Sequence, residues 1–546
     1  MNTELTTQLA AAVKRLYAIE LTVELTRPDA KFGDYASNVA LQLTKQVGKN
    51  PREIAGELAG ALEAIESVKQ VDIAGPGFLN IWLTDSALAA ALDAAPAKSR
   101  SSQTVVIETN NPNPFKAMHI GHAFNAIVAD TIANLIEESG AHTCRVSYHG
   151  DVGAHVGKSM YSLLRYVDGD PGKLEQIAPD ERNSFMSKMY AEGARAYKDD
   201  PAAKVEIDEL AKQSFTREDP VYAAVYDTCK AWSFEQIDEI VARLGNQPIE
   251  RRFLESDADA RGVPIVKKNV PKVFHESDGA LIFPGSEYGS FDNAFVTSRG
   301  LGLYGARDLG LMQLKNEYFH PDKSYIVTAE EQRDYFKGVI KAAELAMPEL
   351  TGVTVNISTG TVKLTTGKMS SRSGDVVEIA WLFDQIREAL QREGVTTDDA
   401  ILAGALRYEF LRVRVGSDVV FDVDAAVSIK GNSGPYLQYA HARARSILGK
   451  ATRTGELPAE LEPAERTLVG KLGEYQDALG RAELELMPHH VANYLYELSQ
   501  EFNRFYEHNR VIGDAREATR LWLVERYADT LQGGLAILGI HAPQQM

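Results

Sequence analysis

The sequence predicts a multidomain α/β protein with a small α/β domain, a central parallel sheet flanked by helices, and an all-α C-terminal domain. Three observations predict this. A β-branched run at residues 105–108 is followed by a polar loop, a helical pattern and a second strand pattern at residues 144–148. Two further strand patterns occur at residues 325–329 and 353–357. From about residue 381 onward the pattern is largely helical.

The composition is that of an ordinary globular protein, and the length of 546 residues predicts about three or four domains. No apolar run approaches the roughly 20 residues of a membrane span, and the N-terminus has no signal-peptide pattern. Cys144 and Cys229 are too few for a disulfide framework or a zinc site. We therefore expect a cytoplasmic protein with no structural metal and no membrane partner.

The net charge of −18 argues against nucleic-acid binding by the whole surface. The charge is unevenly spread, because residues 1–100 carry only −2 and residues 431–546 only −3. The two ends are therefore the better places to expect contacts with RNA.

Residues 1–100 have the pattern of a small α/β domain. Helices are expected over the first twenty residues, over residues 39–45 and from near residue 52, and strands over residues 71–74 and 78–83. A linker rich in alanine and serine follows at residues 95–102.

The first strand of the central sheet leads into a loop with two prolines, and a helix begins after His119 and ends at Gly140. A helix start attracts phosphate through its free N–H groups and its dipole. His119 and His122 are three residues apart and share one face of the first turn. Gly121 between them has no side chain, so a flat ligand can approach the backbone there.

Residues from about 161 to 290 are expected to be a helical insertion, with a strand at residues 279–284 returning to the sheet. A helix begins at residues 303–309. After the last strand comes a loop, Lys368-Met369-Ser370-Ser371-Arg372, flanked by glycines. Its hydroxyls and cations suit a polyphosphate.

The C-terminal part contains a helix beginning at residues 434–445 and a long helix from residue 489 to residue 509 that is rich in aromatic residues. Aromatic rings interleaved with cations suit stacking on RNA bases, although most of these rings are expected to be bundle core.

Four signatures resemble those of one family. His119-Ile-Gly-His122 resembles the HIGH motif of class I aminoacyl-tRNA synthetases, and the loop at residues 368–372 resembles their KMSKS motif without its second lysine. The N-terminal runs Phe-Gly-Asp-Tyr, Asn-Pro-Arg-Glu-Ile-Ala and Gly-Pro-Gly-Phe-Leu-Asn resemble the N-terminal domain of arginyl-tRNA synthetases. The C-terminal helices resemble the anticodon-binding domain named for the DALR signature.

The resemblance implies a domain for contact with the tRNA D-loop at 1–100 and a Rossmann-type catalytic domain at 101–380. It also implies a connecting helical segment at 381–430 and an anticodon-binding domain at 431–546. The implied activity is that of an arginine–tRNA ligase, which uses ATP with Mg²⁺, L-arginine and tRNA(Arg) and releases AMP and pyrophosphate. The family leans monomeric, and it implies that activation of arginine requires bound tRNA.

The resemblance also implies individual residue roles. A guanidinium is a planar fork of donors that stays charged, so its pocket should offer carboxylates. The residues matched to the arginine pocket are Glu108, Asn113, His119, Tyr304, Asp308 and Gln332. Those matched to catalysis and ATP binding are Lys116, His119, Gly121, His122, Lys368, Met369, Ser370, Ser371 and Arg372. Those matched to tRNA binding are Phe78, Asn80, Tyr436, Gln438, Tyr439, His441, Arg443 and Arg445.

Two alternative functions remain open at this point. A small-molecule nucleotidyl transferase of the same superfamily would explain residues 101–380 but leave both terminal domains without a role. A non-catalytic tRNA-binding relative would not need the intact His119, His122 and Lys368. Whether Lys116 or Arg372 replaces the missing lysine of the loop also stays open.

Overall fold

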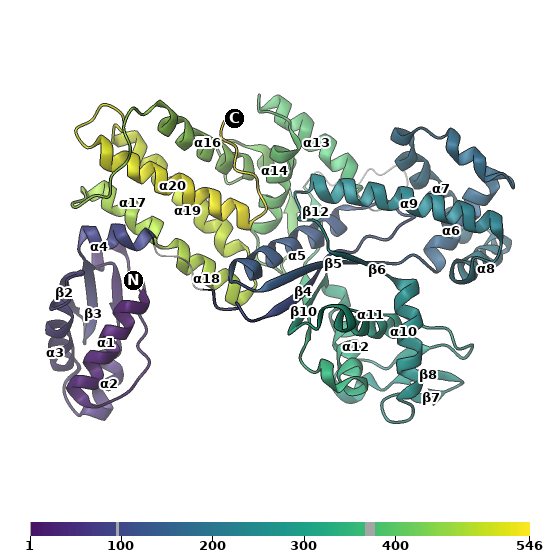
Figure 1. Ribbon diagram of the computed structural model, residues 1–546, viewed down its shortest axis with the longest axis horizontal. Helices are drawn as coiled ribbons and strands as arrows, with labels where there is room; N and C mark the ends of the chain where they lie inside the picture. Colours follow the sequence, from purple (N-terminus) through teal and green to yellow (C-terminus); the bar gives the residue numbers. More distant parts are fainter. Residues whose placement is uncertain (1, 94–97, 366–376) are drawn as a thin grey trace.

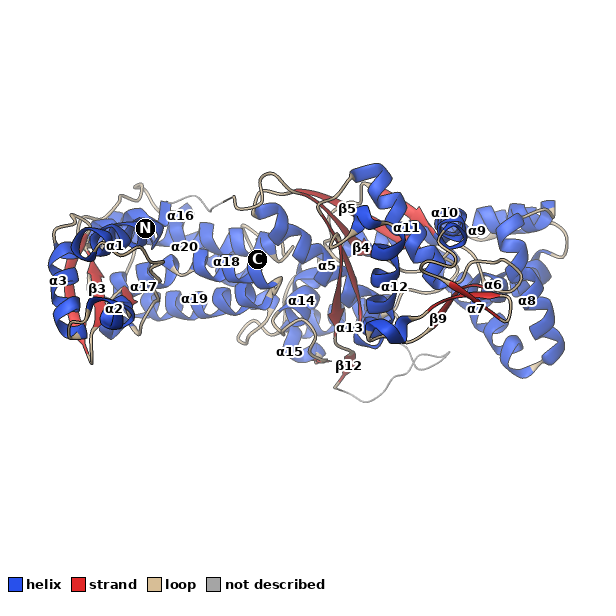
Figure 2. Cartoon of the chain, turned by 90° about the horizontal axis from the view of Figure 1, so that it is seen from below, coloured by secondary structure: helices blue, strands red, loops and turns tan. Residues whose placement is uncertain are grey.

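The computed structural model describes residues 2–93, 98–365 and 377–546 (Figure 1). The molecule is elongated, with the N-terminal region at one end, a helical bundle next to it, and the large parallel sheet with its insertions beyond the bundle (Figure 2). In the described part of the chain, no helix has both the length and the apolar character needed to cross a bilayer.

The N-terminal region is a three-stranded antiparallel sheet, in the order β1-β3-β2, packed against helices. Its elements are α1 (Asn2–Tyr17), β1 (Tyr35–Ser37), α2 (Val39–Val47), α3 (Pro51–Glu63), β2 (Val68–Ala74), β3 (Phe78–Leu83) and α4 (Asp85–Ala90). The helices and strands predicted here are present. The strand β1 was not predicted, because its three residues are too few for an alternating pattern to be recognised.

The central sheet is parallel throughout, in the order β11-β10-β4-β5-β6. Its strands are β4 (Thr104–Asn110), β5 (His142–His149), β6 (Arg251–Leu254), β10 (Lys323–Ala329) and β11 (Thr354–Thr359). The chain runs from β4 to β5 and β6 on one side, whereas β10 and β11 lie on the other. The order therefore reverses between β4 and β10, which is where open parallel sheets bind ligands.

The crossover helix α5 (Ile120–Glu138) joins β4 to β5, and four helices lie between β5 and β6. These are α6 (Ala154–Val167), α7 (Arg182–Asp199), α8 (Pro201–Thr216) and α9 (Pro220–Arg243). The segment between β6 and β10 contains α10 (Glu255–Lys268), β7 (His275–Ser277), β8 (Ala280–Phe283), β9 (Asn293–Val296) and α11 (Tyr304–Phe319), and α12 (Arg333–Ala346) follows β10.

Two sequence-based expectations about this region were wrong. The segment expected to be one helical insertion contains β6, the edge strand of the central sheet. This strand has four residues, two of them arginine, so no hydrophobic run reveals it. The strand expected to return to the central sheet is β8, which instead forms a separate antiparallel sheet with β7 and β9. A short strand pattern does not specify its pairing partner.

In its described residues, the C-terminal part is helical apart from two short strands, β12 (Val362–Leu364) and β13 (Val419–Phe421). Its helices are α13 (Ile379–Arg392), α14 (Asp399–Leu411), α15 (Val423–Val427), α16 (Gly434–Lys450), α17 (Pro463–Gly473), α18 (Tyr475–Glu485), α19 (His489–His508) and α20 (Glu517–Ile537). The long helix predicted from residue 489 is therefore present as α19.

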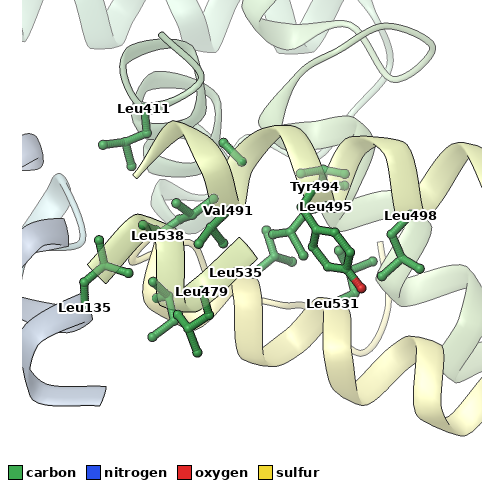
Figure 3. Close-up of a cluster of buried hydrophobic side chains, with 14 of the residues drawn as sticks. Leu135, Leu411, Leu479, Val491, Tyr494, Leu495, Leu498, Leu531, Leu535 and Leu538 are labelled. Carbon is green, nitrogen blue, oxygen red and sulfur yellow. The ribbon is translucent and has the colours of Figure 1, made fainter. Parts of the chain in front are cut away.

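The bundle core is continuous with α5. Leu135 of α5 lies beside leucines of the bundle helices (Figure 3). Arg407 of α14 is fully buried, donates to Asp130 of α5 at 2.8 Å, and also donates to the backbone oxygens of Leu244 and Leu538. The C-terminal half of α5 is thus fixed by the bundle, while its N-terminus faces the edge of the sheet between β4 and β10.

Candidate active site

The loop between β4 and α5 lies at the carboxyl edge of the sheet, and His119 precedes the first turn of α5. The backbone at this point is held by the segment after residue 376, because Ile120 N–H donates to Val377 at 2.9 Å and Ile379 N–H donates to Met118 at 3.1 Å. Lys368, Met369, Ser370, Ser371 and Arg372 lie outside the described residues.

The two histidines of the motif form one unit. Their rings stack with centroids 3.6 Å apart, and His122 Nδ1 accepts from the backbone N–H of His119 at 3.3 Å. Burial lowers the pKa of His119 to about 4 and holds that of His122 well below its usual range. Both imidazoles are therefore neutral at pH 7, so they can act as neutral hydrogen-bond donors but not as cations.

Gly121 and Lys116 complete this end of the site. A Cβ on Gly121 would lie 3.2 Å from two atoms of the His119 ring, so only glycine leaves the ring undisturbed. Burial and the nearby Lys158 lower the pKa of Lys116. Burying a cation next to a second one makes this position favourable for an anionic ligand.

A cavity of about 780 Å³ opens at this edge of the sheet. It is lined by nine of the residues predicted from the sequence, namely Glu108, Asn113, Lys116, His119, Gly121, His122, Tyr304, Asp308 and Gln332. Segments more than 200 residues apart in the chain therefore meet in one cavity.

The carboxylates of the cavity differ in what they already bind. Glu108 accepts from Lys315 Nζ and from Asn111 Nδ2, both at 2.7 Å. Glu255 pairs with Arg307 at 2.9 Å. A buried lysine therefore already neutralises Glu108, and contact between Glu108 and arginine stays a prediction.

Asp308 has no such partner. It is half-buried, and its one hydrogen bond within the described residues comes from the hydroxyl of Tyr335, at 2.5 Å. The pKa of Asp308 is raised to about 7, chiefly by burial and also by the nearby Glu108 and Glu255, while the Tyr335 hydrogen bond and the charge of Lys315 act in the opposite direction. An uncompensated buried carboxylate is costly, so this position favours a cationic ligand.

The remaining predicted pocket residues line the same cavity as Asp308. Tyr304 is 67% exposed and lies one helical turn before Asp308 on α11. Gln332 is exposed and precedes α12, and the Asn113 side-chain oxygen accepts from the Gly150 N–H at 2.9 Å. Glu255, and the cations Arg307 and Lys315 that pair with the cavity carboxylates, were not predicted from the sequence. Of these, Lys315 could have been found, because it lies two helical turns after Asp308.

Comparison with known proteins agrees with this geometry. The family model described as "tRNA synthetases class I (R), catalytic domain" matches residues 85–401. "Arginyl tRNA synthetase N terminal domain" matches residues 3–83, and "DALR anticodon binding domain" matches residues 437–546. The chain belongs to the arginyl-tRNA synthetase family.

Curated relatives and solved structures agree with this assignment. An arginine–tRNA ligase of Frankia casuarinae is 31% identical over 98% of this chain and 97% of its own length. An arginine–tRNA ligase of a Shewanella species is 29% identical over 97% of this chain and 96% of its own length. The fold matches that of the Thermus thermophilus arginyl-tRNA synthetase with a TM-score of 0.79, at 24% identity over the whole of both chains. The family, the class I fold and the ligase activity predicted from the sequence are thereby confirmed.

The residues expected to touch tRNA in this arginyl-tRNA synthetase differ in accessibility. In the N-terminal domain, Phe78 is 41% exposed at the start of β3, whereas Asn80 is buried between the neighbouring strands β1 and β2. The ring is available for stacking. Asn80 lies on the same face of β3 as Phe78, and its reading of a base edge stays a prediction.

In the anticodon-binding domain, two of the expected contacts were wrong. Gln438 donates to the backbone oxygens of Ala400 and His541, and a ring nitrogen of His441 lies 2.8 Å from the Pro543 carbonyl. Both side chains are fully buried. They lie three apart on the inner face of α16 and hold the C-terminal tail, a role that a motif match does not reveal.

The outer face of α16 remains accessible. Tyr439 is 42% exposed, and Arg443 lies one turn further along, with its guanidinium 4.7 Å from the ring centroid of Tyr506. Tyr436 is half-buried, and Arg445 is paired with Asp529 at 2.8 Å. Tyr439 and Arg443 are therefore the members of the predicted set that combine accessibility with freedom from a carboxylate partner.

Proposed function

We propose that the cavity binds L-arginine and ATP side by side and that Asp308 is the counter-ion of the arginine guanidinium. The observation that carries this proposal is the half-buried Asp308 carboxylate, which has no cation partner among the described residues, in a cavity that Lys116, His119 and His122 also line. A guanidinium would supply the charge and the donors that Asp308 lacks. The other pocket residues proposed from the sequence, Asn113, Tyr304 and Gln332, line the same cavity.

In the proposed first step, a carboxylate oxygen of arginine attacks the α-phosphorus of ATP. The new P–O bond forms as the bond to the β-phosphate breaks, and pyrophosphate leaves. The chain's residues act by position and charge rather than as nucleophiles. His119 and His122 would donate to phosphate oxygens, and Lys116, with Lys368 and Arg372 from beyond the described residues, would hold the β- and γ-phosphates. Mg²⁺ would arrive with ATP as part of the substrate.

In the second step, the 2′-hydroxyl of the terminal adenosine of tRNA(Arg) attacks the carbonyl carbon of arginyl-adenylate, and AMP leaves. The N-terminal domain and the outer face of α16 would hold the tRNA, with Phe78, Tyr439 and Arg443 as contacts. The proposed setting is the cytoplasm, and the proposed state is a monomer.

The test is ATP–pyrophosphate exchange with each of the twenty amino acids, with and without tRNA. We expect exchange with arginine alone, and only when tRNA(Arg) is present. Loss of arginine-dependent exchange in Asp308→Asn, with the exposed Asp418→Asn as a matched control, would support the assignment of the pocket. Exchange with a different amino acid, or full arginine activity in Asp308→Asn, would contradict it.

A further inference from the structure

Lys315 is a buried cation that the proposed mechanism does not use. It lies on α11, two turns after Asp308, and its side chain is 1% exposed. Its ammonium is 2.7 Å from Glu108, whose side chain is equally buried and lines the cavity. A buried ion pair of this kind loses the hydration of both charges, so it adds little net stability over an apolar pair of the same shape.

The charges that face Asp308 come from every element packed around it. They are Glu108 of β4, Tyr148 of β5, Glu255 of α10, Arg307 and Lys315 of α11, and Tyr335 of α12. Both cations already have carboxylate partners, because Lys315 pairs with Glu108 and Arg307 pairs with both Glu255 and Asp259. Among the described residues, Asp308 is therefore the one cavity carboxylate that is not exposed and has no cation partner.

We propose that Lys315 is a specificity-determining positioning residue. It neutralises Glu108, so that Asp308 is the one half-buried carboxylate of the cavity without a cation partner among the described residues, and the pocket holds one guanidinium. Lys315 acts through Glu108 and does not touch the amino acid. This inference rests on the proposed function, since it gives Asp308 the role of counter-ion.

The pair should respond to substitution in a way that a purely structural pair would not. In Lys315→Met, Glu108 becomes an unpaired acid beside Asp308, which makes ionisation of Asp308 harder. In Glu108→Gln, Lys315 becomes an unpaired cation on the Asp308 face of α11, which makes ionisation of Asp308 easier and competes with the guanidinium. The double variant Glu108→Gln/Lys315→Met removes both effects.

The experiment measures kcat and KM for arginine by ATP–pyrophosphate exchange with tRNA, from pH 6 to pH 9, in the full-length parent and these three variants. The acidic limb of kcat/KM should move up by about one pH unit in Lys315→Met and down by a similar amount in Glu108→Gln. It should return to the parental position in the double variant. The changes should fall on KM for arginine, and KM for ATP should stay within about twofold of the parent.

The matched control is the exposed pair Lys212 and Glu209 on α8, which are 2.7 Å apart. Their Met and Gln variants should leave the pH profile unchanged, because the pair is exposed and does not line the cavity that contains Asp308. Near-UV circular dichroism checks that each variant is folded. If Lys315→Met alone does not fold, the comparison of Glu108→Gln with the double variant carries the test.

Shifts in the same direction in both single variants would overturn the inference. So would a double variant whose profile is no closer to the parent than that of Glu108→Gln. The test separates this inference from the proposed function through Asp308→Asn. If that variant activates arginine normally, the pocket assignment fails. If it is inactive while the Lys315 and Glu108 variants do not behave as described, only the role of Lys315 fails.

Discussion

Replacing Asp308 with asparagine should stabilise the ligand-free protein while abolishing arginine activation. The folded-state pKa of Asp308 is about 7, against an ordinary value of 3.8. Because the folded value is the higher one, ionisation of Asp308 destabilises the folded state. The effect is absent below pH 3.8, grows between the two values, and is complete above pH 7. The shift of about three pH units corresponds to about 4 kcal/mol.

Asparagine cannot ionise but can still accept the Tyr335 hydrogen bond. The gain in the free energy of unfolding should therefore be about 2 kcal/mol at pH 5 and about 4 kcal/mol at pH 8. Urea unfolding of both proteins without ligand, at the two pH values, measures it. Asp418→Asn is the control, because a backbone hydrogen bond from Thr361 lowers the pKa of Asp418 and no gain is expected. An equal gain in the free energy of unfolding at both pH values would show that the gain does not come from the ionisation of Asp308. A loss of stability at both pH values would show that the charge of Asp308 is already balanced in the ligand-free protein.

Three further predictions follow from the site. KM for arginine should rise about tenfold per pH unit below pH 7, because binding needs the ionised form of Asp308; a flat profile from pH 6 to 8 in pyrophosphate exchange would contradict this. Gly121→Ala should push the ring of His119 aside and lower kcat for activation by about 10²-fold with folding retained, as stopped-flow adenylate formation and circular dichroism would show. Tyr439→Ala should weaken tRNA binding by about 1–3 kcal/mol without changing the melting temperature, whereas Gln438→Ala should lower the melting temperature. Filter binding measures the first effect and thermal unfolding the second. The reverse pattern would refute the assignment of Tyr439 to the outer face of α16 and of Gln438 to its inner face.

Much of the fold could be predicted because it depends on local order. The strand-loop-helix unit from β4 to β5 has a β-branched run, two loop prolines and helical periodicity, and each of these acts over a few residues. Longer strands with an apolar pattern, such as β10, were likewise recognisable. The edge strand β6 was not, because an exposed strand needs no hydrophobic run and its place depends on β5 beside it.

For the site, the sequence by itself determined which pairs of functional residues lie on the same face of a helix. It placed His119 and His122 on one turn, and Tyr304 and Asp308 on one face of α11, because these relations depend only on the 3.6-residue repeat. The family resemblance then predicted that these residues belong to one site, and in the structure they line one cavity.

Only the tertiary structure decided which of the carboxylates is open. Lys315 is 207 residues from Glu108 in the chain, so the pair that neutralises Glu108 exists only once α11 packs beside β4. The same holds for Gln438 and His441, whose burial depends on the C-terminal tail crossing α16. A side chain's charge and hydrogen-bonding capacity are properties of its residue type. Whether they are left free for a ligand depends on partners brought from distant parts of the chain.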